Sequence, residues 1–380
     1  MEVEIPTQHR AQQQASKVKA SAWHELPVAA AKTLRRDPLL AVNFMLLVVG
    51  TACGPLLLRA YFVRGGTRKW LSSLLQTAGW PLLLLPLCAS FLSRRQRRRQ
   101  DATVFLMTPR LLAASVVVGL MTGADNFLYA YSQAYLPVST SSILISTQLA
   151  FTAGFALLLV RHRFTGSTVN AVVLLSVGAA MLGLDAGGDR PPGVSGAQYR
   201  AGFGMALGAA ALYGLVLPVM ELSQAWHAAR AGAAALTYTL VVEMQLVIGL
   251  IATAFCAVGM LVNKDFQAIP GEARQFQLGE AGYYLLLVGT AAVYQCFCLG
   301  TIGAIFYASA LLAGVIIAVL IPVTEVLAVV FFDEHFSATK GLALGLSLWG
   351  LASYFYGELR TKAPDTEHQS SFCTDPDCEK

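Results

Sequence analysis

Apolar runs of about 20 residues recur along the chain between residue 39 and residue 357. An α-helix needs roughly 20 apolar residues to cross the hydrocarbon core of a bilayer. Only 13% of the 380 residues are charged, whereas a soluble globular chain carries about 25%. The sequence therefore predicts an all-α, multi-pass integral membrane protein.

Ten transmembrane helices are expected, arranged as two inverted five-helix repeats around a central cavity. The expected spans are residues 39–59, 71–92, 109–133, 139–160, 167–186, 199–221, 233–260, 281–303, 308–332 and 338–357. The predicted organisation is a polar N-terminal tail over 1–37 with no signal peptide, a first repeat over 38–186, a connecting loop over 187–198, a second repeat over 199–358 and a polar C-terminal tail over 359–380.

The inverted repeat is predicted from a weak internal similarity at an offset of 172 residues. The segment from Tyr135 ends on the basic Arg161–Arg163, and the matching segment from Tyr307 ends on the acidic Asp333 and Glu334. The offset aligns Ile145 with Ile317, Thr152 with Thr324, Ala156 with Ala328, Ala171 with Ala343, Leu174 with Leu346, and Gly178 with Gly350. Opposite charges predict opposite crossing directions, as in an inverted-repeat transporter. Chance similarity between two Leu- and Ala-rich helices is the alternative.

The distribution of Lys and Arg predicts the orientation, because short basic loops stay on the cytoplasmic side. The Arg-rich loop at 94–99 and the basic loop at 161–163 are expected to be cytoplasmic, as are both termini. Arg59, Arg64, Arg68 and Lys69 contradict this scheme, since they would be extracellular unless their loop folds back on the protein. The net charge of +5 is attributed to orientation, so no nucleic-acid partner is expected.

Strongly polar residues deep in a span cost free energy and usually face a cavity. On span three Asn126, Tyr129 and Gln133 share one helix face. Asp125, beside them, has a local cap or pair as an alternative role. The other candidates are Gln76 and Trp80 on span two, Gln148 on span four, Tyr213 on span six, Glu243 on span seven, Gln295 on span eight, and Glu325 on span nine, just after Pro322, which can break that helix where a cavity is lined. Hydrogen bonding between helices is the structural alternative for Gln76, Gln133, Tyr213 and Gln295.

The predicted ligand is a flat heteroaromatic base, because amide side chains satisfy its edge atoms and aromatic rings stack on its face. The spans hold few Lys or Arg residues, which argues against a phosphorylated substrate. A carboxyl group in an apolar setting can gain and lose a proton during a cycle. Glu243 and Glu325 are therefore the candidates for proton coupling, and Glu325 aligns with Ala153 in the first repeat.

No metal or cofactor is expected. Cys373 and Cys378 form a Cys-x4-Cys pair with no second pair, and Cys53, Cys88, Cys256, Cys296 and Cys298 lie in apolar segments. The six histidines are expected in tails or loops.

From about Phe62 to Leu359 the chain resembles the plant purine permease family of the drug/metabolite transporter superfamily. The resemblance rests on the segments Trp70–Ser73, Gly79–Pro81, Asp125–Tyr131, Tyr135–Ser142, Thr147–Phe151, Gly208–Gly214, Glu243–Gln245, Asp265–Pro270, Pro322–Glu325 and Tyr354–Glu358. It implies ten spans, proton-coupled uptake and purine-type substrates: adenine, adenine-type cytokinins such as trans-zeatin, and related alkaloids. The expected substrate-binding residues are Trp80, Asn126, Tyr129, Gln148, Tyr213, Glu243 and Gln295.

We therefore expect a proton-coupled importer in the plasma membrane that works by alternating access, with a small purine or cytokinin and protons as its partners. The alternatives are a drug/metabolite-type transporter of an alkaloid or a nucleotide sugar, and a membrane receptor. An intramembrane enzyme is disfavoured, since no metal-binding His pair or Ser/His pair lies at membrane depth. The oligomeric state, the preferred base and the physiological direction stay open.

Overall fold

A computed structural model describes residues 38–97, 106–160, 166–184, 190–191, 193–232, 237–307, 310–332 and 337–362. Within these ranges the protein is helical and contains no strand. The two tails, the charged ends of the repeat segments at 161–163 and 333–334, and much of the Arg-rich loop lie outside the described residues.

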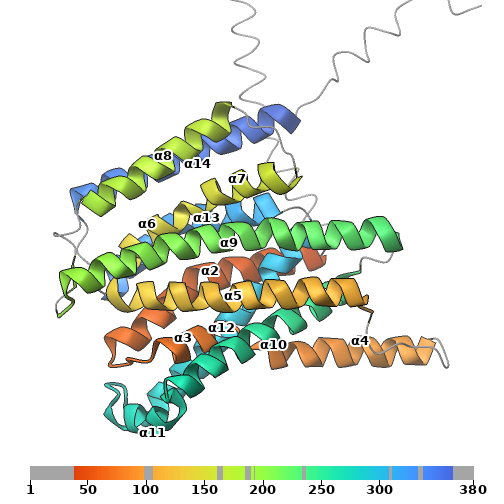
Figure 1. The fold of residues 1–380 in the computed structure, drawn as a ribbon, viewed down its shortest axis with the longest axis horizontal. Helices are drawn as coiled ribbons and strands as arrows, with labels where there is room; N and C mark the ends of the chain where they lie inside the picture. The colour runs from red at the N-terminus through yellow and green to blue at the C-terminus, as the bar shows by residue number, and fades with distance from the viewer. Residues whose placement is uncertain are drawn as a thin grey trace, which may run out of the picture.

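The helices run back and forth along one common direction, horizontal in Figure 1. They are α2 (Pro38–Val63), α3 (Lys69–Leu75), the 3-10 helix η1 (Trp80–Leu83), α4 (Leu84–Arg97), α5 (Pro109–Tyr135), α6 (Val138–Ser146), α7 (Gln148–Val160), α8 (Gly166–Leu184), α9 (Gly196–Ala231), α10 (Tyr238–Val262), α11 (Asp265–Gln275), α12 (Gly279–Tyr307), α13 (Ala310–Phe332) and α14 (Ala338–Lys362). The start of α2 and the end of α14 lie at the same end of the bundle, on the right in Figure 1.

Several long helices begin at the capping residues that their sequences supply. Thr108 accepts a hydrogen bond from the Leu111 N–H before α5, and Thr237 does the same for Leu240 before α10. Ser195 and Gln198 form a reciprocal capping box at the start of α9. These side chains satisfy backbone N–H groups that have no partner within the helix.

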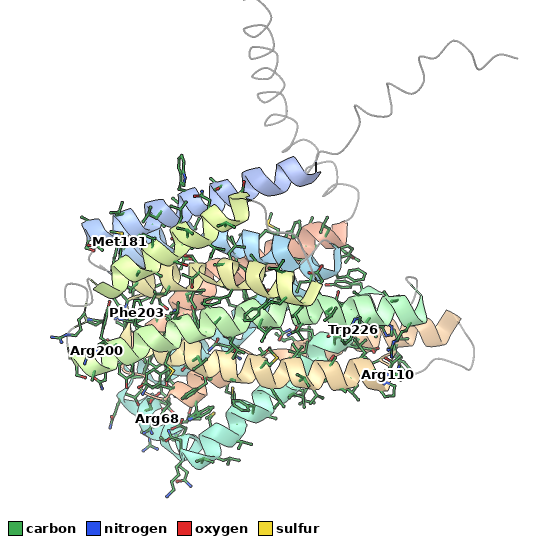
Figure 2. All side chains as sticks on the ribbon, turned by 45° about the horizontal axis from the view of Figure 1, so that its top comes forward. Arg68, Arg110, Met181, Arg200, Phe203 and Trp226 are labelled. Atoms are coloured by element: carbon green, nitrogen blue, oxygen red, sulfur yellow. The ribbon has the colours of Figure 1, made fainter. Side chains whose placement is uncertain are left out.

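Seven described segments are long and apolar enough to cross a membrane. They are Leu39–Val63, Lys69–Leu92, Pro109–Tyr135, Val138–Leu159, Gly196–Ala231, Tyr238–Val262 and Gly279–Tyr307. Leu85, Val262 and Leu285 are 74%, 81% and 75% exposed on the outside of the bundle. In Figure 2 Arg68 and Arg200 lie at one end, and Arg110 and Trp226 at the other. An apolar outer face with basic side chains at its two ends suits a lipid bilayer.

Two of the predicted spans are broken helices. The second predicted span is divided into α3, η1 and α4, with a turn at residues 76–79, and the fourth is divided at Thr147 into α6 and α7. The suggested break at Pro322 is wrong, since α13 continues through that position. A loop expected at 261–280 instead contains α11, and α9 extends to Ala231, so that His227 lies on a helix and not in a loop.

Small residues let the backbones of packed helices approach each other closely. A Cβ at Gly300 on α12 would lie 2.3 Å from the Leu47 N on α2. The α8–α14 contact is reciprocal: a Cβ at Gly178 would lie 3.2 Å from the Ala343 O, and one at Gly350 would lie 3.2 Å from the Ala171 O. Figure 1 shows these two helices side by side. Close small-residue packing of this kind holds membrane helices together.

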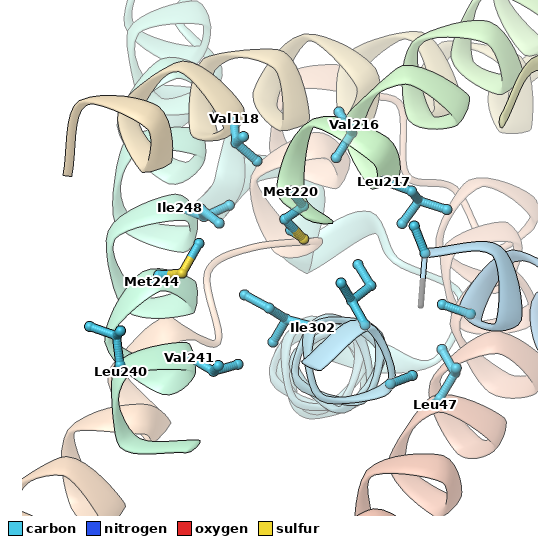
Figure 3. Packing of buried hydrophobic residues seen from close by; sticks show 14 of the residues in the cluster. Leu47, Val118, Val216, Leu217, Met220, Leu240, Val241, Met244, Ile248 and Ile302 are labelled. Atoms are coloured by element: carbon cyan, nitrogen blue, oxygen red, sulfur yellow. The ribbon is translucent and has the colours of Figure 1, made fainter. Parts of the chain in front are cut away.

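A cluster of buried apolar side chains joins α2, α5, α9, α10, α12 and α13. Figure 3 shows its members, among them Leu47, Val118, Leu217, Leu240 and Ile302. The members lie in the first parts of α2, α5 and α10 and in the last parts of α9 and α12. The cluster therefore fills the half of the bundle nearer the end where α2 begins.

At the opposite end, the basic residues around the α2–α3 connection are engaged with the protein. Arg59 donates to the Gln133 O at 2.9 Å, and the Lys69 Nζ lies 5.1 Å and 4.8 Å from the ring centroids of Tyr131 and Tyr135. Arg68 pairs with Asp265 and Glu272 of α11, at 3.3 Å and 3.8 Å. Folding back on the protein, the alternative considered for this loop, is therefore observed for these three residues.

Glu272 is the centre of a polar cluster at this end of the molecule. Its Oε1 accepts hydrogen bonds from the hydroxyls of Tyr61 and Tyr283, and its Oε2 accepts from the Thr67 hydroxyl at 3.0 Å. We call Tyr61, Thr67, Arg68, Asp265, Glu272 and Tyr283 the Glu272 cluster. It joins the α2–α3 connection to α11 and α12.

Candidate functional site

A cavity lies between the helices, with an empty volume of about 910 Å³ that includes open solvent at its mouth. Its walls come from α2, α5, the α6–α7 break, α9, α10, α12, α13 and the turn after α3. Both helix breaks border it, because Gln76 follows the end of α3 and Gln148 begins α7. Non-helical backbone at membrane depth is tolerated where it lines a cavity.

The polar wall of the cavity consists mainly of amide side chains: Gln76, Asn126, Gln148 and Gln245. Gln76 donates to the Asn126 backbone O at 3.0 Å. The Asn126 Nδ2 and the Gln148 Nε2 are buried and have no hydrogen-bond partner in the described part of the chain. Such donors are costly to leave unsatisfied, so they favour a ligand that offers hydrogen-bond acceptors.

Aromatic rings form the second part of the wall. Tyr213 on α9 and Phe297 on α12 have ring centroids 5.9 Å apart, with an interplanar angle of 30°. Tyr294 meets Phe297 edge-on at 6.5 Å, and Tyr129 contributes from α5. These rings offer apolar faces and phenol hydroxyls to a planar ligand.

The electrostatic character of the cavity comes from one acidic residue. Among the described residues that line it, Asp125 carries the only carboxyl group, and none is Lys, Arg or His. Within the described ranges no group of three His, Cys, Asp or Glu side chains is placed to hold a metal ion. The arrangement suits a neutral or cationic organic ligand with hydrogen-bonding edges.

Residues 38–363 match a family model described as purine nucleobase transmembrane transport. The chain belongs to this family of purine nucleobase transporters. Two relatives from Arabidopsis thaliana are each 47% identical: purine permease 3, with 85% of this chain and 91% of the relative covered, and purine permease 2, with 87% and 95% covered. The resemblance to purine permeases is thereby confirmed.

More distant matches agree. A probable purine permease 5 of Arabidopsis thaliana is 35% identical, covering 86% of this chain and 87% of the relative. One solved crystal structure of a protein superposes with a TM-score of 0.52 at 18% identity, covering 84% of this chain and 99% of the other, which shows a shared fold alone. The family and the apolar helices make the chain a multi-pass integral membrane transporter, not an enzyme.

Four of the seven residues that the sequence predicts to bind substrate line the cavity: Asn126, Tyr129, Gln148 and Tyr213. They come from three regions of the chain, on α5, α7 and α9. Gln133, predicted on the same face as Asn126 and Tyr129, lies beyond the cavity and donates to the Tyr129 hydroxyl at 2.7 Å.

The other three are not among the described residues that line the cavity. Trp80 packs beside Leu83, Val242 and Leu246. It also lies against Gly249, where an added Cβ would be 2.9 Å from the Trp80 Cβ. Gln295 is buried, and neither of its amide atoms has a hydrogen-bond partner among described residues.

Glu243 is buried on α10 and its Oε2 accepts the Leu106 N–H at 2.8 Å. That contact holds the segment that enters α5. Glu325 lies on α13, but its side chain is outside the described residues.

Asp125 and Gln76, for which the sequence left a structural role open, line the cavity, as do Gln245, Tyr294 and Phe297, which the sequence analysis did not single out. Asp125 was given a local cap or pair as an alternative, yet no hydrogen bond or ion pair joins its side chain to a described residue. Its adjacency to Asn126 was the available signal. Tyr294 and Phe297 resemble ordinary apolar positions of a span and gave none.

Proposed function

We propose that this protein imports purine bases and their derivatives in symport with protons. The substrates are adenine and adenine-type cytokinins such as trans-zeatin. Family membership supports a purine, and the amide wall of the cavity is the observation that supports the binding mode. Asn126 and Gln148 donate to ring nitrogens of the base, while Tyr213 and Phe297 lie against its face.

The composition of the cavity wall disfavours the nucleotide-sugar alternative. A phosphorylated substrate is usually held by Arg or Lys. No such side chain is found among the described lining residues, and the acidic residue there, Asp125, would repel a phosphate when it is ionised. An alkaloid remains compatible with these walls as a related substrate.

Alternating access between two inverted five-helix halves is the proposed transport cycle. Ten crossings result if α3, η1 and α4 form one span and α6 and α7 another. Two observations support the inversion: Ile145 and Ile317, aligned by the internal repeat, both line the cavity, and the aligned Gly178 and Gly350 lie in the reciprocal contact between α8 and α14. Substrate sites between inverted halves are typical of such transporters. We place both termini in the cytoplasm and the protein in the plasma membrane.

The proton is proposed to bind a carboxyl group at membrane depth, for which Glu243 and Glu325 are the residues predicted from sequence. Trp80, Glu243 and Gln295 likewise stay predictions for substrate binding. Purified protein in liposomes with an imposed pH gradient provides the test. Labelled adenine should accumulate, trans-zeatin should compete, and a protonophore should abolish accumulation.

Replacing the amides tests the binding mode. Gln148→Ala and Asn126→Ala should each raise the concentration for half-maximal adenine uptake about fivefold, since a net hydrogen bond contributes about 1 kcal/mol. Gln224→Ala is the matched control, because Gln224 is also buried with an unpartnered Nε2 yet is not among the described lining residues. Equal effects of Gln148→Ala and Gln224→Ala would count against the proposed site.

A further inference from the structure

Asp125, in the middle of α5, is a carboxyl group that could bind a proton at the cavity. Asp125 is only 7% exposed, and it lines the cavity beside Asn126. The Oδ1 is buried and has no hydrogen-bond partner, and no ion pair to a described residue compensates the carboxyl group. An unpaired carboxylate at membrane depth costs free energy and marks a functional site.

The titratable groups that face Asp125 across the cavity are neutral side chains. They are Tyr129 on α5, Tyr213 on α9, and Tyr294 and Cys298 on α12. The lining residues from α2, α3 and α10 contribute no titratable group to the described wall.

Arg200 and Arg230 of α9 are exposed, and the other charged side chains on the helices packed against α5 have partners other than Asp125. Arg59 of α2 donates to the Gln133 O, and Lys69 of α3 lies over Tyr131 and Tyr135. Glu221 of α9 accepts the Ala310 N–H, and Glu243 of α10 accepts the Leu106 N–H. In the described structure, therefore, none of these cations is seen to neutralise Asp125.

We propose that Asp125 is the group that takes up the transported proton, an inference that rests on the proposed symport function. A carboxylate oxygen forms an O–H bond with a proton from water on the side to which the cavity opens. After the cavity has turned to the other side, that bond breaks and the proton passes to water there. Because the base occupies the same cavity, the charge of Asp125 couples the two binding events.

Geometry distinguishes Asp125 from Glu243. Glu243 accepts a backbone N–H and is not among the described lining residues, whereas Asp125 has no such acceptor role and borders the substrate space. A proton held on Asp125 is also within the volume that the base enters. Protonation can thus control substrate entry directly.

The test compares Asp125→Asn with the wild-type protein in liposomes. The amide keeps the size of the side chain but cannot carry the proton. Gradient-driven accumulation of adenine should be lost, while exchange of external for internal adenine, which needs no net proton movement, should fall much less. Glu280→Gln removes an exposed carboxyl group at the start of α12 and should change neither assay.

Each outcome decides the proposal. Gradient-driven accumulation by Asp125→Asn at the wild-type level would overturn it. If the variant transports nothing, adenine binding to detergent-solubilised protein is measured from acid to neutral pH: loss of its wild-type pH dependence supports the proposal, and retention overturns it. Wild-type uptake that ignores the gradient would instead refute the proposed symport itself.

Discussion

Individual polar residues at membrane depth have two kinds of role in this protein. Asn126 and Gln148 present unpartnered nitrogens at the cavity, whereas Glu243 and Gln76 bond to backbone groups of other segments. Residue type alone does not separate these roles, because amides and carboxyl groups serve in both. Burial is also similar, so the decisive property is the neighbour that each atom meets.

Glu243 allows this distinction to be tested. Glu243→Ala should lower the melting temperature of the detergent-solubilised protein, because the half-buried Leu106 N–H loses its acceptor at a cost of about 1 kcal/mol. Glu243→Gln keeps a carbonyl acceptor and should recover most of that stability. Loss of gradient-driven uptake by a stable Glu243→Gln protein would instead show that Glu243 carries the proton, as the sequence predicted.

At the scale of helices, the positions of the long apolar elements were predictable from the sequence. The expected span at 109–133 corresponds to α5, Pro109–Tyr135, and that at 281–303 to α12, Gly279–Tyr307. Length and apolar composition suffice there, since the bilayer thickness fixes both. The internal offset also aligned Ile145 with Ile317, and both residues line the cavity.

The breaks within the second and fourth predicted spans were not predicted from the sequence. Thr147 bonds the Leu144 O and Ser73 bonds the Lys69 O through their side chains, which competes with regular helical bonding. Gly79 and Pro81 then redirect the second predicted span. These residues are common in unbroken membrane helices, so their effect depends on the tertiary contacts around them.

The α8–α14 contact predicts which glycines of α14 are essential. Gly350→Val should lower the melting temperature, because a Cβ at this position already lies 3.2 Å from the Ala171 O and the valine methyl groups add further volume. Overpacking of this kind costs about 1–3 kcal/mol of stability. Gly345→Val on the same helix is the control, since nothing lies within 4 Å of its Cβ position. Equal destabilisation by the two variants would contradict close packing at Gly350.

For the molecule as a whole, one end is filled by apolar side chains and the other carries the Glu272 cluster. A transporter of this design is held by different forces at its two ends. Apolar packing has no charges for dissolved ions to screen, whereas the ion pairs of Arg68, whose side chain is 37% exposed, are partly screened although Asp265 and Glu272 are buried. Ionic strength should therefore affect the two ends unequally.

The Glu272 cluster predicts a global stability effect from a residue far from the cavity. Glu272→Ala should lower the melting temperature by removing the acceptor of Tyr61, Tyr283 and Thr67, with a cost of about 1–3 kcal/mol. Glu280→Ala serves as the control, since Glu280 is exposed. A Glu272→Ala protein as stable as this control would show that the cluster contributes nothing to the fold.

The Glu272 cluster also has a consequence for biosynthesis. Arg68 and its partner Asp265 are 197 residues apart in the chain. While the first helices leave the ribosome and enter the membrane, the acidic partners of Arg68 do not yet exist. Early in synthesis Arg68 therefore acts as a free cation on the nascent chain, and only the later emergence of α11 neutralises it. Insertion machinery and the finished protein thus encounter the same residue with different effective charge.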